Sequence, residues 1–139
     1  MKRITVLLAD DHTIVREGLR ALLALEKDIE VVGEAANGHQ AVAFAHNLVP
    51  DVVVMDLAMP LLNGFDAIER IRESTPPSTK LLVLSAYDND AYIQQARALG
   101  ASGYLVKQND SHILAAAIRE VYQGRVYFKP IQPVSMQCP

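Results

Sequence analysis

The chain has 139 residues, half of them hydrophobic, and carries a formal net charge of −3. This length suits one domain with a sizeable core, and the slightly acidic charge excludes the basic field that nucleic acid or an anionic membrane attracts. The single cysteine, Cys138, excludes an internal disulfide and suits a reducing cytosol. Asp10 and Asp11 cut the first apolar run too short for a signal peptide or a membrane span, so we predict a cytoplasmic domain.

Short apolar runs alternate along the chain with segments in which apolar residues recur as stripes at helical spacing. The runs predict strands over residues 4–9, 30–35, 52–55, 80–84 and 103–106. Gly33 weakens the second strand, which places it at a sheet edge. The stripes predict five helices: Val15, Leu19, Leu22 and Leu23; Ala41, Phe44, Ala45 and Leu48; Ala67, Ile68 and Ile71; Tyr92, Ala96 and Leu99; Leu114, Ala117, Ile118 and Val121. Gly100 is expected to close the fourth helix, and Asp110 or Ser111 to cap the fifth.

This alternation predicts an α/β fold with a doubly wound parallel sheet of five strands and helices on both faces. The domain is expected to span residues 1–124. Residues 125–139 contain three prolines and show no periodicity, so they are interpreted as a linker.

Polar side chains follow four of the predicted strands. Asp10 and Asp11 follow the first, Asp56 the third, Ser85 the fourth and Lys107 the fifth. Ligands of open α/β sheets bind outside the carboxyl ends of strands, so these side chains are expected to share one crevice. Three carboxylates repel each other unless a cation intervenes, and oxygen-only ligands favour Mg²⁺. The serine hydroxyl and the lysine charge suit phosphoryl oxygens.

The expected chemistry is metal-assisted phosphoryl transfer to a carboxylate. Asp56 ends the strand expected at the centre and is the best nucleophile, able to form an aspartyl-phosphate. Asp10 and Asp11 are better placed as metal ligands, together with the backbone carbonyl of Ala58. Aspartates also cap helices, so a cap of the first helix remains an open alternative for Asp11.

The order and spacing of these residues resemble a known family. Asp10-Asp11, Asp56-x-x-x-Pro60-x-x-x-Gly64, Ser85-Ala86 and Lys107 resemble the receiver domain of bacterial two-component response regulators. The resemblance covers Ile4 to about Gly124. It implies a flavodoxin-like fold with strand order 2-1-3-4-5.

The resemblance also implies roles for the residues. Asp56 would accept a phosphoryl group from a sensor histidine kinase, while Asp10 and Asp11 hold Mg²⁺. Ser85 would bind the phosphoryl oxygen and Lys107 would neutralise its charge. Such a protein is a phosphoacceptor that assists its own phosphorylation and dephosphorylation, rather than an enzyme.

A conformational switch follows from the same resemblance. Ser85 would move toward the phosphoryl group and Tyr104 would rotate inward, although a simple packing role fits Tyr104 equally well. Tyr87 and Tyr92 flank this loop. The fourth helix, fifth strand and fifth helix are the predicted homodimer or partner face, and no membrane partner is expected.

Further segments resemble the NarL/FixJ-type subfamily, namely Leu84–Asp88, Gly100–Lys107 and Gly124–Phe128. In that subfamily a LuxR-type helix-turn-helix domain normally follows the receiver, so transcription regulation and DNA binding are expected of the full-length protein. The alternative is a stand-alone receiver that docks on protein partners. The chain departs from many receivers at Gln108, where proline is common, and at Ala58, where a polar residue is common.

Two further classes of protein fit the sequence less well. A hydrolase of the haloacid-dehalogenase type usually has a second acidic residue at the position of Ala58. A flavin-binding electron carrier would need a hydroxyl- and glycine-rich phosphate loop at the position of Asp10 and Asp11. His12 is expected to start the first helix or to help a kinase dock, and not to bind metal. Four arginines are interpreted as solvated helix faces: Arg70, Arg72, Arg119 and Arg125.

Overall fold

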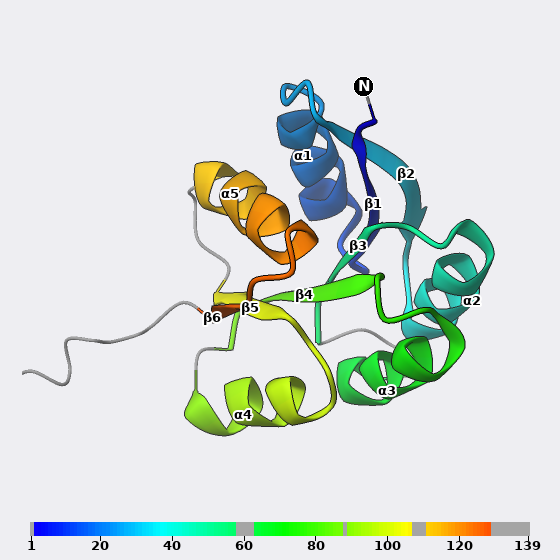
Figure 1. Ribbon diagram of the computed structural model, residues 1–139, viewed down its shortest axis with the longest axis vertical. Helices are drawn as coiled ribbons and strands as arrows, with labels where there is room; N and C mark the ends of the chain where they lie inside the picture. Colours follow the sequence, from blue (N-terminus) through cyan, green and yellow to red (C-terminus); the bar gives the residue numbers. More distant parts are fainter. Residues whose placement is uncertain (1, 58–62, 88, 107–110, 129–139) are drawn as a thin grey trace, which may run out of the picture.

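The computed structural model describes residues 2–57, 63–87, 89–106 and 111–128. Its helices and strands alternate along the chain as expected (Figure 1). In chain order they are β1 (Ile4–Ala9), α1 (Thr13–Leu23), β2 (Ile29–Ala35), α2 (Gly38–Leu48), β3 (Val52–Met55), α3 (Gly64–Ser74), β4 (Lys80–Ser85), α4 (Asp90–Ala98), β5 (Gly103–Val106), α5 (Ser111–Tyr122) and β6 (Tyr127–Phe128).

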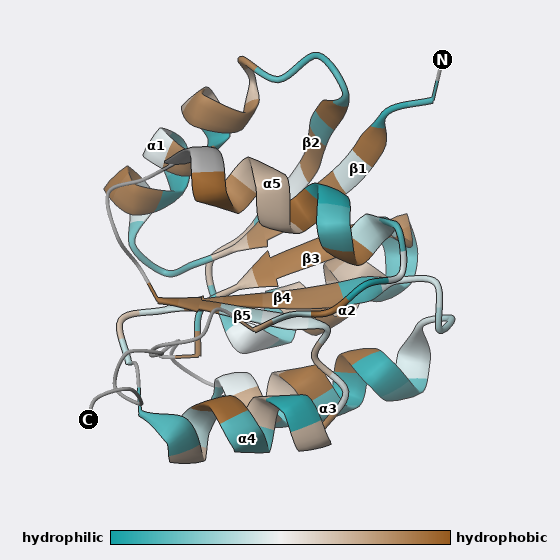
Figure 2. Ribbon diagram, turned by 60° about the vertical axis from the view of Figure 1, so that its left-hand side comes forward, coloured by the Kyte–Doolittle hydropathy of each residue, from teal (hydrophilic) through white to brown (hydrophobic). Residues whose placement is uncertain are grey.

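The strands form one parallel sheet in the order β2-β1-β3-β4-β5-β6. Helices α1 and α5 cover one face of it, and α3 and α4 cover the other (Figure 2). The flavodoxin-like fold is therefore confirmed, with β2 at one edge as Gly33 predicted. Within the described ranges, no helix is long and apolar enough to cross a membrane.

Within the described residues the sheet has six strands, one more at its edge than the five expected. The extra strand, β6, lies within the segment that was interpreted as a linker, and it pairs with β5 at the sheet edge. The Tyr127 amide donates to the Ser102 carbonyl at 2.9 Å. A strand of two residues is too short to show a period of two, which is why the sequence pattern did not reveal it.

Every central strand is apolar on both faces because it packs between two helical layers. One cluster of buried side chains joins the strands to α2, α3 and α4 and includes Leu7, Val53 and Val83. The other joins them to α1 and α5 and includes Leu8 and Val54. Successive strand residues thus alternate between two cores, and this fixes the direction in which each strand-end side chain points.

Helix α1 is rotated relative to the expected stripe. Leu23 is buried, but Val15 and Leu22 are about 40% exposed, so their predicted burial is wrong. Arg16 takes a place on the inward face, where its guanidinium donates to Glu34 at 3.0 Å and to the Asp10 carbonyl at 2.5 Å. Because Arg16 lies seven residues before Leu23, its polar bonds and the leucine contacts select the same face.

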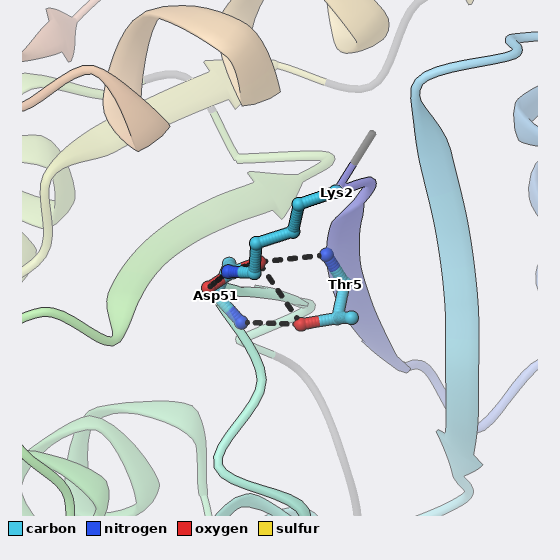
Figure 3. Close-up of polar contacts among 3 residues, drawn as sticks. All are labelled: Lys2, Thr5 and Asp51. Atoms are coloured by element: carbon cyan, nitrogen blue, oxygen red, sulfur yellow. Dashed lines mark hydrogen bonds and ion pairs between the residues drawn. The ribbon is translucent and has the colours of Figure 1, made fainter.

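The amino ends of β1 and β3 are joined by side-chain hydrogen bonds of Asp51 (Figure 3). Its carboxylate accepts from the Thr5 amide at 2.9 Å and the Thr5 hydroxyl at 3.1 Å. The Asp51 amide donates to Thr5 Oγ1 at 2.9 Å, and Lys2 Nζ approaches the carboxylate at 3.3 Å. These bonds fix the register of the two strands one residue before their ladder begins at Val6 and Val52.

Replacing this carboxylate should destabilise the fold. Asp51→Ala leaves the partly buried Thr5 amide without its charged acceptor, and we expect a loss of about 2 kcal/mol in the free energy of unfolding. Urea denaturation followed by circular dichroism measures the loss. Glu30→Ala, which removes the exposed ion pair with Arg3, is the matched control and should have a much smaller effect. Equal losses in the two variants would contradict a special role for Asp51.

Arg72 and Arg119, which were interpreted as solvated, make hydrogen bonds to other parts of the fold, so that interpretation is wrong for them. Arg119 on α5 binds Asp28 at 2.8 Å and Glu26 at 2.6 Å, which ties α5 to the turn between α1 and β2. Arg72 donates to the Thr79 carbonyl, and burial lowers the pKa of its guanidinium. Arg70 is exposed as expected, and Arg125 is exposed while paired with Glu120.

The Arg119 ion pairs predict a pH dependence of stability. The hydrogen bond from Arg119 lowers the pKa of Asp28 in the folded chain. The contribution is therefore complete at neutral pH and is lost as the pH falls below about 4, through the depressed pKa. Arg119→Met should cost up to about 1 kcal/mol at neutral pH, since the pair is partly exposed.

Urea denaturation at neutral pH and at about pH 3 checks this expectation. The difference between the wild-type chain and Arg119→Met should shrink at the lower pH, whereas the exposed control Arg70→Met should show little effect at either pH. A difference that is the same at both pH values would show that the ion pairs do not stabilise the fold.

Candidate functional site

Two buried carboxylates lie at the carboxyl ends of neighbouring strands. Asp10 and Asp56 directly follow β1 and β3 and are 3% and 4% exposed. The Asp10 amide donates to the Ala35 carbonyl and the Asp56 amide to the Ala9 carbonyl, both at 3.0 Å. These bonds continue the sheet ladder by one residue, so both carboxylates are held by rigid backbone.

Asp11 and His12 complete a cluster with these two residues. One candidate ligand atom from each of Asp10, Asp11, His12 and Asp56 lies within 4.8 Å of the others. The Asp11 Oδ1 atom is buried and has no hydrogen-bond partner. Three carboxylates, one with a buried oxygen that lacks a donor, provide the hard oxygen ligands that suit Mg²⁺. The residues present therefore fit a divalent cation.

The alternative that Asp11 caps the first helix is not supported. The N-cap residue of α1 is His12, whose side chain makes no capping hydrogen bond. His12 was expected to start this helix, and it does. Its imidazole, however, lies beside the acid pair, with Nδ1 at 3.1 Å from Asp10 Oδ1 and 3.2 Å from Asp11 Oδ1.

Arg16 is a residue of the site that the sequence analysis missed. Its guanidinium bonds to the Asp10 carbonyl and to Glu34, which fixes the backbone that carries the acid pair. The spacing could have indicated it, because Arg16 lies one helical turn after His12 and on the same face as Leu19 and Leu23.

Gly64, at the start of α3, lies against Leu57, the residue directly after Asp56. The Gly64 amide donates to the Leu57 carbonyl at 2.9 Å. A Cβ atom at Gly64 would lie 2.4 Å from the Leu57 Cα atom, so a side chain cannot be accommodated without moving the backbone. Glycine at this position lets the start of α3 pack directly against the residue after Asp56.

Ser85 and Tyr104 both bond to the backbone of Tyr87. The Ser85 side chain is completely buried at the end of β4, and its Oγ accepts from the Tyr87 amide at 3.0 Å. Tyr104 on β5 is 1% exposed and donates its hydroxyl to the Tyr87 carbonyl at 2.6 Å. The two polar groups of one residue are thus held by side chains from two strands.

Aromatic packing continues from this point onto the helices of the same face. The rings of Tyr87 and Tyr92 pack edge to face with centroids 5.2 Å apart, and those of Tyr92 and Phe65 with centroids 5.6 Å apart. Tyr104 belongs to the same core cluster. The loop after β4 is therefore connected to both α3 and α4 by ring contacts.

Several predicted site residues lie outside the described residues. They are Ala58, Pro60, Lys107, Gln108 and Asp110. The structure brings together Asp10, Asp11 and Asp56. It places Ser85 at the same edge of the sheet, one strand beyond β3.

Comparisons with known proteins agree with this arrangement. The family model of the response regulator receiver domain matches residues 6–119. The chain is 38% identical to the transcriptional regulatory protein DegU of Brevibacillus brevis over 92% of its length, and 37% identical to the response regulator protein VraR of Staphylococcus aureus over 96%. These matches span 54% and 64% of the two relatives, so the chain covers less than two thirds of either.

A solved structure shows the same similarity in three dimensions. The crystal structure of a LuxR-family two-component response regulator from Aurantimonas sp. superposes with a TM-score of 0.87 at 35% identity, covering 93% of this chain and 91% of that one. The family match covers most of the sequence, and its members share the observed fold. The chain belongs to the response regulator receiver domain family.

Proposed function

We propose that this chain is a phosphorylation-dependent switch of a two-component system. Asp56 accepts a phosphoryl group from a sensor histidine kinase, with Mg²⁺ held by Asp10, Asp11 and Asp56. The observation that carries this proposal is the meeting of three carboxylates at the ends of two adjacent central strands. Transcription is then regulated through a LuxR-type helix-turn-helix domain of the full-length protein, which also supplies DNA binding.

The transfer itself needs little covalent chemistry from the protein. A carboxylate oxygen of Asp56 attacks the phosphorus, a P–O bond forms, and the P–N bond to the kinase histidine breaks. The departing imidazole keeps the electron pair of that bond. Bound Mg²⁺ offsets the negative charge of the carboxylates and the phosphoryl oxygens. Because Asp56 is held by its backbone bond to Ala9, little conformational entropy is lost when it reacts.

The hydrogen bonds of the Tyr87 backbone support the proposed roles of Ser85 and Tyr104. A Ser85 hydroxyl that turns toward a phosphoryl oxygen gives up the bond that it accepts from the Tyr87 amide. Tyr104 is bonded to the carbonyl of that same residue, so the change reaches β5. We propose that the α4–β5–α5 face carries the response to a homodimer or another partner, and that Lys107 neutralises the phosphoryl charge.

A second candidate is a receiver that acts by docking on protein partners alone. Its support is the exposure of two apolar side chains near the opposite ends of α1, Ile14 and Leu25, which are 84% and 77% exposed. The phosphorylation chemistry is the same in the two cases.

Phosphorylation at Asp56 is tested directly by intact mass. Incubation with Mg²⁺ and phosphoramidate should add one phosphoryl group to the wild-type chain, because small phosphoryl donors need no kinase surface. Asp56→Asn should gain none. The matched control is Asp66→Asn, an exposed aspartate on α3, which should be modified like the wild type. Modification of Asp56→Asn to the wild-type extent would disprove the assignment.

Asp11 provides a separate test of the metal site. Asp11→Asn removes the charge of the carboxylate whose buried Oδ1 has no hydrogen-bond partner. We expect Mg²⁺ affinity, measured by isothermal titration calorimetry, to fall about tenfold or more, which corresponds to at least ~1.4 kcal/mol. The exposed Asp90→Asn on α4 should bind Mg²⁺ as the wild type does. An unchanged affinity of Asp11→Asn would remove Asp11 from the ligand set.

A further inference from the structure

The imidazole of His12 lies within the acidic cluster although more than half of its side chain is exposed. Nδ1 is 3.1 Å from Asp10 Oδ1 and 3.2 Å from Asp11 Oδ1. It makes a hydrogen-bond contact with the Asp10 oxygen but none with the Asp11 oxygen, which is buried without a donor. One ring nitrogen therefore lies close to two carboxylate oxygens, and one of these has no hydrogen bond to satisfy it.

These spacings are those of neighbouring ligands around one metal ion. With metal–ligand bonds of about 2.1 Å, adjacent ligands lie about 3.0 Å apart in an octahedron and about 3.4 Å apart in a tetrahedron. The two observed distances fall between these values. One ligand atom from each residue of the cluster lies within 4.8 Å of the others, so small side-chain rotations would let a single ion contact His12 and both carboxylates.

The backbone keeps His12 in this place. The His12 amide donates to Asp10 Oδ1 at 2.9 Å, and its carbonyl accepts from the Arg16 amide at 2.9 Å in the first turn of α1. The position of the ring is thus set by the start of a helix and by the acid pair. Such fixed ligands lose little entropy when a metal binds.

We propose that His12 is a nitrogen ligand of the divalent-cation site and makes it prefer first-row transition ions over Mg²⁺. This inference rests on the proposed metal site at Asp10, Asp11 and Asp56. Oxygen ligands alone suit Mg²⁺, whereas an imidazole nitrogen adds affinity for first-row transition ions, in an order that rises from Mn²⁺ through Co²⁺ to Cu²⁺ and falls at Zn²⁺. Mg²⁺ still binds through the carboxylates, but Mn²⁺ and Co²⁺ bind more tightly.

The test is spectroscopic and does not depend on phosphorylation. Mn²⁺ bound to the untagged chain should show electron spin echo modulation from a coordinated imidazole ¹⁴N. His12→Asn should lose this modulation, and asparagine keeps a good residue at the N-cap, so the helix start is preserved. His39→Ala changes an exposed histidine on α2 and is the matched control; it should retain the modulation.

Calorimetric titrations give the second measurement. His12→Asn should bind Co²⁺ about tenfold or more weakly than the wild type, whereas its Mg²⁺ affinity should change by less than about threefold. His12→Ala, whose side chain offers no ligand atom at all, should behave in the same way.

The outcomes separate this inference from the proposed function. A chain that binds Mg²⁺ and Mn²⁺ without ¹⁴N modulation, and whose Co²⁺ affinity is the same in His12→Asn, would overturn the role of His12 and leave the metal site intact. A wild-type chain that binds none of these ions would overturn the metal site and the histidine ligand together.

Discussion

The parallel pairing of β1 with β3 is the constraint on which the site depends. The ladder runs from Val6 and Val52 to Ala9 and Met55, and the Asp56 amide extends it by one more bond to Ala9. This pairing brings Asp10 and Asp56, which are 46 positions apart in sequence, to the same edge of the sheet. A change of register by one residue would turn Asp56 toward the opposite helical layer, since strand side chains alternate between faces. Asp51 and Thr5 secure the register at the other end.

The bonds that stabilise the fold and the acidic cluster of the candidate site lie at opposite ends of the strands. Their amino ends carry hydrogen bonds that are satisfied within the chain, such as those of Asp51 and Arg119. Their carboxyl ends collect like charges, and Asp11 has a buried oxygen with no hydrogen-bond donor. Such a cluster is costly for the isolated chain and favourable for one that binds a cation, because the ion supplies the missing charge.

The Tyr87 backbone gives this edge a connection to the rest of the molecule. Its amide bonds to Ser85 and its carbonyl to Tyr104, so neither side chain can reorient without affecting the loop between them. Ring contacts extend the connection to Tyr92 and Phe65. A change in the position of the buried Ser85 hydroxyl can be transmitted in this way to the aromatic side chains, because packed aromatic groups have few alternative arrangements.

The amino-acid sequence by itself determined the alternation of strands and helices, the edge position of β2 and the polar residues at strand ends, because periodicity and strand boundaries are local properties. It did not reveal β6, the rotation of α1 or the ion pairs of Arg119, since each depends on a partner distant in the chain. Only the tertiary structure placed His12 beside both Asp10 and Asp11 and joined Ser85 to Tyr104 through Tyr87. Side-chain direction is set by packing and by hydrogen bonds across elements, and a sequence pattern does not contain these.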